Sequence, residues 1–75
     1  MLNVSIVLYH PDWSQVADLT RVILNSSSVN MVYWIDNSPK SQAHLPIESP
    51  QITYHHTGKN LGYGAAHNIA IRESI

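Results

Sequence analysis

The sequence predicts an α/β chain with an open parallel sheet of about three strands and flanking helices. Two nearly continuous apolar runs, Val4–Tyr9 and Met31–Ile35, are rich in β-branched residues, as is typical of strands buried on both faces. A helical pattern separates the two runs, and strand–helix–strand units of this kind pair their strands in parallel through a right-handed crossover. A glycine turn, Gly58–Gly64, then precedes a second helical pattern.

The first helix has recognisable start and stop signals. Asp12, with Gln15 three residues later, predicts a capping box in which side chains satisfy N–H groups at the helix N-terminus. Apolar residues then recur at the helical period from Trp13 to Leu24. Asn25–Ser28 is expected to end the helix, because its side chains compete for backbone hydrogen bonds.

The second half of the chain is less regular. The second strand is expected to stop at Asp36–Pro39, and residues 40–50, with two prolines, predict a loop with room for one helical turn. Gln51–His55 alternates like a third strand, and a helix rich in small residues is expected over Ala65–Ile75. Because no stop signal precedes Ile75, we expect the chain to be part of a larger domain.

Composition excludes several classes of function. The chain has 75 residues and no cysteine, so it forms neither disulfides nor a thiolate zinc site. The net charge of -1, with scattered Lys and Arg, argues against a nucleic-acid partner. Only 12% of the residues are charged, against about 25% in typical soluble domains, so we expect marginal stability or self-association. The apolar run Val4–Tyr9 is too short to span a membrane, which makes a cytoplasmic location the default.

Polar residues follow the strands, and ligands of open parallel sheets bind beyond the carboxyl ends of the strands. Asp36 ends the second strand, where its carboxylate can accept hydrogen bonds from a ribose hydroxyl or a base N–H. Asp36–Pro39 is also ordinary turn chemistry, because Asp, Asn and Ser all favour turns. The two roles are compatible, and the residues alone do not separate them.

The glycine segment ahead of the second helix is a further candidate site. Gly62 and Gly64 would let the backbone approach an anion such as a pyrophosphate at the helix N-terminus, or take up positive φ. A tight strand-to-helix turn without a ligand also explains the glycines, and their spacing alone favours this turn. Asn68 is a poor helix former inside this helix, and it either bonds the preceding loop or faces a ligand.

The five histidines do not predict a metal site. His55 and His56 are neighbours on a strand, so their side chains point to opposite faces and cannot chelate one ion together. The other three have no regular ligand spacing. No nucleophile-elbow motif supports a Ser-His-Asp triad either.

Three segments together resemble the opening motifs of family 2 glycosyltransferases, most closely those of the rhamnosyltransferase-like branch, which builds bacterial surface polysaccharides. They are Val4–His10, Ile35–Ser38 and Asn60–Asn68, and they span essentially the whole chain in the family's order and spacing. The third segment is the most specific. The family often has Thr-Tyr-Asn where this chain has Leu8-Tyr9-His10. Because His10 departs from the family's pattern, the family's base contacts are not carried over to it.

The resemblance implies a GT-A (Rossmann-like) fold, with residues 1–75 as the N-terminal nucleotide-sugar-binding portion of an incomplete domain. It implies that Tyr9 lines a base pocket and that Asp36 contacts the base or ribose. The nucleotide-sugar contacts implied in this way are Tyr9, Asp36, Asn37, Asn60, Gly62 and Asn68.

The intact enzyme would transfer a sugar from a nucleotide-diphosphate-sugar donor to a glycan or lipid-linked acceptor, in bacterial polysaccharide synthesis. The family usually needs a divalent metal, Mg²⁺ or Mn²⁺, held by an Asp-x-Asp motif that this sequence lacks. After Asp36 the only carboxylates are Glu48 and Glu73. The metal neutralises the developing diphosphate charge and a base deprotonates the acceptor, so we expect donor binding only, with no catalytic or metal-ligating residue here.

Two other interpretations remain open. The chain could be a non-catalytic nucleotide- or dinucleotide-binding module, because Gly62-x-Gly64 partly matches the dinucleotide fingerprint. It could also be a structural remnant without a ligand. For the intact transferase, a cytoplasmic location with association to the membrane is also compatible with the sequence.

Overall fold

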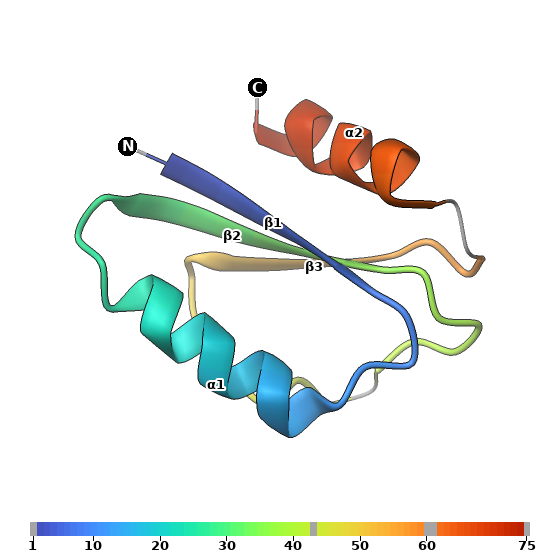
Figure 1. The fold of residues 1–75 in the computed structure, drawn as a ribbon, viewed down its shortest axis with the longest axis horizontal. Coiled ribbons are helices and arrows are strands. Elements are labelled where there is room, and N and C mark those ends of the chain that lie inside the picture. The colour runs from blue at the N-terminus through green and yellow to red at the C-terminus, as the bar shows by residue number, and fades with distance from the viewer. Residues whose placement is uncertain (1, 43, 60–61, 75) are drawn as a thin grey trace.

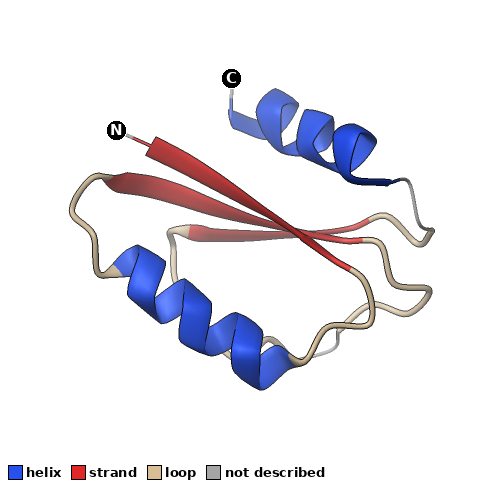
Figure 2. Cartoon of the chain, viewed as in Figure 1, coloured by secondary structure: helices blue, strands red, loops and turns tan. Residues whose placement is uncertain are grey.

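The computed structural model describes residues 2–42, 44–59 and 62–74, and this part of the chain forms a three-stranded parallel sheet with a helix on each face (Figures 1 and 2). The elements in chain order are β1 (Leu2–Leu8), α1 (Trp13–Leu24), β2 (Val29–Asp36), β3 (Ile52–His56) and α2 (Gly62–Ser74). The predicted α/β class and the parallel sheet are confirmed.

The strands lie in the order β1-β2-β3, and both pairs are parallel. Leu8 of β1 is opposite Asp36 of β2, and Asp36 is opposite His56 of β3. The carboxyl ends of the three strands therefore meet at one edge of the sheet. α2 begins near that edge and runs back along the opposite face from α1 (Figure 1).

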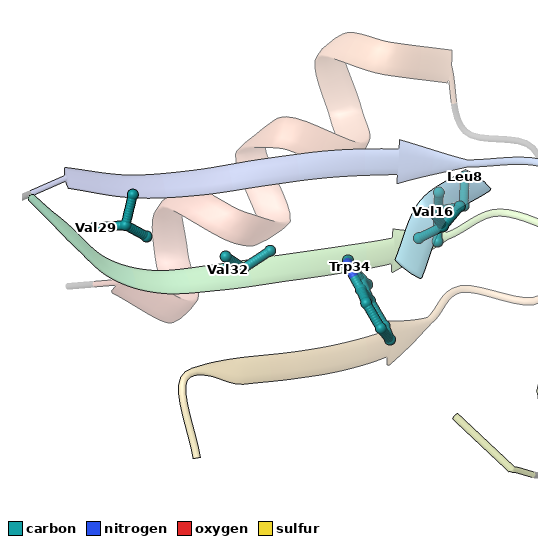
Figure 3. Packing of buried hydrophobic residues seen from close by; sticks show 5 residues of the cluster. All are labelled: Leu8, Val16, Val29, Val32 and Trp34. Carbon is teal, nitrogen blue, oxygen red and sulfur yellow. The ribbon is translucent and has the colours of Figure 1, made fainter. Parts of the chain in front are cut away.

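The face of the sheet beneath α1 carries the larger core. Trp34 is fully buried at its centre, and its indole N–H donates to the hydroxyl group of Thr20 on α1 at 3.2 Å. The Thr20 hydroxyl in turn donates to the Val16 carbonyl at 2.7 Å. The buried apolar residues of this cluster, drawn in Figure 3, are Leu8, Val16, Val29, Val32 and Trp34. Residues Leu45 and Ile47 of the connection between β2 and β3 pack against the same cluster.

The face beneath α2 has a smaller core. Ala66 and Ala70 of the helix pack against Tyr33 and Ile35 of β2. Because these two buried side chains are small, the helix can approach the sheet closely. The hydroxyl group of Ser5 on β1 is hydrogen-bonded to Nδ1 of His67, which joins the helix to the edge strand.

The predicted start of α1 is confirmed. Asp12 is the N-cap residue, and its carboxylate accepts hydrogen bonds from the backbone N–H groups of Ser14 and Gln15. A further hydrogen bond, from the Ser14 hydroxyl, contributes most to lowering the pKa of Asp12 below its ordinary value. Asn25 is the C-cap, as the predicted stop signal requires.

Several predicted boundaries were wrong by a few residues. β1 ends at Leu8, because the chain bends at Tyr9 and His10, where His10 has a φ of 47°. α2 starts at Gly62 rather than at Ala65, so Gly62 and Gly64 lie in its first turn. The described residues of the 40–50 connection form bends and no helix, and a turn closed by the Ile52 N–H and the Ser49 carbonyl at 3.1 Å leads into β3. Within the described part of the chain, neither helix has the length and apolar character needed to cross a membrane.

Candidate functional site

Backbone hydrogen bonds connect the three strand ends. The N–H of Asn37 donates to the Leu8 carbonyl at 2.8 Å, and the N–H of Thr57 donates to the Asp36 carbonyl at 2.9 Å. The N–H of His10, just past β1, donates to the Ser38 hydroxyl group at 2.7 Å. The segment after β2 is therefore held between the segments that follow β1 and β3.

The Asp36 carboxylate lies at the centre of this region and is 1% exposed. Its Oδ1 atom accepts a hydrogen bond from the Ser38 N–H at 2.9 Å, a contact that closes a turn. Its Oδ2 atom accepts a hydrogen bond from the Tyr54 hydroxyl at 2.6 Å. The turn role that the sequence offered for Asp36 is thus present, and it leaves lone pairs on both oxygens for a ligand.

Tyr54 is the partner on β3 that holds the Asp36 carboxylate. Burial, reinforced by the hydrogen bond to Asp36, raises the pKa of Tyr54 to about 12. Its hydroxyl group therefore remains a proton donor throughout the neutral range. The same hydroxyl accepts a hydrogen bond from the Gln42 N–H at 2.9 Å.

A pocket of about 290 Å³ opens beside Asp36 at the carboxyl ends of β1 and β2. Its lining combines an aromatic ring, a cation and several hydrogen-bonding groups. The lining residues are His10, Pro11, Trp13, Asp36, Ser38, Lys40 and Gln42. This volume is at the lower limit of the roughly 300–1,000 Å³ that ligand pockets span, so it suits a nucleoside rather than a whole nucleotide sugar.

Tyr9 lines a different pocket. Its side chain is 52% exposed, and it borders a groove of about 440 Å³ between β1 and α1, with apolar residues such as Val7 and Leu19. Pro11 borders both this groove and the Asp36 pocket. Tyr9 and Asp36, expected at one site, therefore border two different pockets that share Pro11.

The remaining predicted contacts are more dispersed. Asn37 is 1% exposed, and its side-chain oxygen accepts a hydrogen bond from the Thr57 hydroxyl at 2.8 Å, which is a structural role. Asn68 is exposed on α2, and neither Asn68 nor Gly62 lines the two pockets described above. Asn60 lies outside the described residues.

The two glycines at the start of α2 differ in what they require. Gly62 has a φ of 78°, a conformation that other residues adopt only with strain. A Cβ atom at either Gly62 or Gly64 would meet no atom within 4 Å. The positive φ alone explains why position 62 needs glycine. This agrees with the interpretation of the segment as a strand-to-helix turn.

The histidines do not gather into a metal site in the part of the chain that is described. No group of three or more His, Asp or Glu side chains there is placed to hold an ion. His56 instead contacts the Ser38 carbonyl through Nε2 at 2.7 Å. The donor set that a divalent metal requires is thus not supplied by these residues.

The residues of the Asp36 region that sequence reasoning missed include Trp13, Lys40, Gln42 and Tyr54. The alternation of β3 places Tyr54 and His56 on one face, but the register that puts His56 opposite Asp36, and so brings Tyr54 to the carboxylate, has no local signal in the sequence. Lys40 and Gln42 belong to an irregular connection whose path the sequence does not reveal.

Comparison of the chain with models of known protein families, with curated proteins and with solved structures found no match.

Proposed function

We propose that this chain forms part of the donor-binding side of a nucleotide-sugar-dependent glycosyltransferase, with the Asp36 pocket as the place for the base and ribose. One observation carries the proposal. A buried carboxylate at the carboxyl end of a parallel strand borders a pocket of nucleoside size. Doubly wound parallel sheets bind ligands at this edge, and here α1 and α2 lie on opposite faces, as in such sheets.

The lining of the pocket offers contacts to a nucleoside and to a phosphate group attached to it. Asp36 can accept a hydrogen bond from a ribose hydroxyl or a base N–H, and the Trp13 ring offers an apolar surface to the base. Lys40 supplies a positive charge for a phosphate group. Since the chain has scattered charge and a net charge of -1, one local cation suits a small anionic ligand better than a nucleic acid.

The transfer reaction itself is not assigned to these residues. A divalent metal would neutralise the departing diphosphate, but the described residues do not form its site. The role proposed for Asp36 is therefore binding, and the catalytic base and metal ligands of the proposed enzyme belong to other parts of it.

Saturation-transfer NMR of the 75-residue chain with UDP, dTDP and NAD tests the proposal. We expect binding of UDP or dTDP, and Asp36→Asn should weaken it by about tenfold, because an amide replaces a charged acceptor. Asp18→Asn is the matched control, since Asp18 is exposed on α1 and paired with Arg21; it should leave affinity unchanged.

The other outcomes identify the alternatives. Binding of NAD without UDP or dTDP would favour a dinucleotide-binding module. Binding of none of the three ligands by a folded chain would contradict the proposal and leave a structural remnant. A folded chain is recognised independently by dispersed amide resonances, so loss of folding and loss of binding can be told apart.

A further inference from the structure

We infer that Tyr54 is a positioning residue of this site, whose hydroxyl group joins two walls of the Asp36 pocket and orients the Asp36 carboxylate toward a bound nucleoside. This inference rests on the proposed function of the pocket. Tyr54 is not among the pocket-lining residues, so it acts on a ligand through its neighbours.

The Tyr54 hydroxyl makes two hydrogen bonds, one to each wall. It donates to Asp36 Oδ2 at 2.6 Å, which ties it to the wall formed by the end of β2. It accepts from the Gln42 N–H at 2.9 Å, which ties it to the wall formed by the irregular connection. Both Asp36 and Gln42 line the pocket. One hydroxyl group therefore sets the separation of the walls and the rotation of the carboxylate.

The Tyr54 ring is itself held by its surroundings. It packs against the core beneath α1, and its centroid is 6.1 Å from that of Trp13, with the rings inclined at 61°. Trp13 also lies 5.5 Å from Trp34 and lines the pocket. The packed ring gives the hydroxyl group a defined place, and a preorganised acceptor needs such support behind it.

The carboxylate keeps free acceptor capacity in this arrangement. Each carboxylate oxygen has two lone pairs, and the Ser38 N–H and the Tyr54 hydroxyl each use one. A hydroxyl or N–H group of a nucleoside could use another. Without Tyr54, the bond from the Ser38 N–H would be the one that remains of these two, and the carboxylate could rotate about its terminal torsion, which has a broad energy minimum.

The test is a double-mutant cycle on the UDP affinity of the 75-residue chain. Tyr54→Phe should weaken UDP binding by about tenfold, comparable to the loss of one hydrogen bond to a charged group. In the Asp36→Asn background the same change should weaken binding by less than about twofold, since the carboxylate it orients is gone. Tyr33→Phe, at a buried tyrosine on the opposite face of the sheet, is the matched control and should leave affinity unchanged.

The results separate this inference from the proposed function. If the wild-type chain binds neither UDP nor dTDP, the proposed function fails and this inference fails with it. If the wild-type chain binds and Tyr54→Phe binds equally well, only the inference is overturned. A purely structural role for Tyr54 would show as a Tyr54→Phe loss of similar size in both backgrounds.

A measurement on the wild-type chain keeps the inference testable if Tyr54→Phe does not fold. Carbon-13 shifts of the Tyr54 ring carbon bearing the hydroxyl group and of the Asp36 carboxyl should both move when UDP is added. The same ring carbon of Tyr33 should not move. UDP binding that leaves the Tyr54 and Asp36 signals in place would overturn the inference.

Discussion

The two faces of the sheet are built from different kinds of side chain. Beneath α1, large aromatic and branched residues interlock around Trp34, and a buried Thr20 hydroxyl satisfies the indole N–H. Beneath α2, alanine side chains meet the sheet, and a side-chain hydrogen bond between Ser5 and His67 links α2 to β1. The α1 face therefore carries most of the apolar burial, and it also supports the Asp36 pocket through Trp13 and Tyr54.

The α1 face shows how the same residues of a small chain can form both a hydrophobic core and the support of a candidate binding site. Asp36 and Tyr54 point to the α1 face, where the same aromatic residues bury apolar area and fix the polar groups. Residues on the α2 face contribute less to apolar burial. Substitutions there should therefore be better tolerated, unless the new side chain is much larger than the old one. Four substitutions test this difference between the two faces.

Trp34→Ala should have the largest effect. Removing a fully buried indole from a core typically costs about 3–5 kcal/mol, against roughly 4–11 kcal/mol of total stability for a domain of this length. Thermal unfolding followed by circular dichroism would measure the loss. Trp13→Ala, at a half-buried indole of the same face, is the control and should cost less. Equal losses of stability in the two variants would mean that the burial of an indole does not determine how much it stabilises the chain.

Ala66→Leu should destabilise the chain by about 1–3 kcal/mol, because extra volume at a fully buried position forces the helix off the sheet. Urea unfolding at equilibrium would measure it. Ala65→Leu adds the same atoms at the exposed neighbouring position and should be nearly neutral. If Ala66→Leu were equally harmless, α2 would not pack closely on the sheet as described.

Ser5→Ala should lower the free energy of unfolding by about 1 kcal/mol, since it removes the partly buried hydrogen bond to His67. Hydrogen exchange of α2 amides should rise with it, because this bond connects the helix to β1. Ser27→Ala, in the exposed connection after α1, is the comparison variant. Unchanged exchange in α2 would show that apolar packing, rather than this hydrogen bond, holds the helix on the sheet.

Asn68→Ala should have the smallest effect and the opposite sign. The residue is exposed on α2, and alanine is the better helix former by roughly 0.5 kcal/mol, so stability should rise slightly. UDP affinity measured on the same variant would test the role that the motif resemblance implies for Asn68. A rise in stability with a loss of affinity would support that role, and unchanged affinity would remove Asn68 from the proposed site.

The sequence was sufficient to predict the features that depend on local signals. The β-branched runs predicted β1 and β2, and Asp12 predicted the start of α1, because capping and strand burial act within a few residues. The sequence was also sufficient to place Asp36 at the end of a strand, because Asp36 directly follows an apolar run.

Features that depend on distant packing could not be predicted in the same way. Tyr54 reaches Asp36 only because β3 pairs with β2 in one particular register. Gln42 reaches Tyr54 through a connection without regular structure, and no periodic pattern describes such a path. The start of α2 was placed too late because two glycines argued against a helix, whereas the first turn of a helix tolerates them.

The parallel pairing of all three described strands also has a consequence for how the chain folds. Leu2 pairs with Val29 and Val32 pairs with Ile52, so each pairing has to close a long stretch of chain, and neither can start as a hairpin. Local contacts within α1 can form early, but the sheet must wait for loop closure, which slows folding. During that search β2 has no partner on either side. Rapid dilution from denaturant at low protein concentration should therefore give a higher yield of folded chain than slow refolding at high concentration.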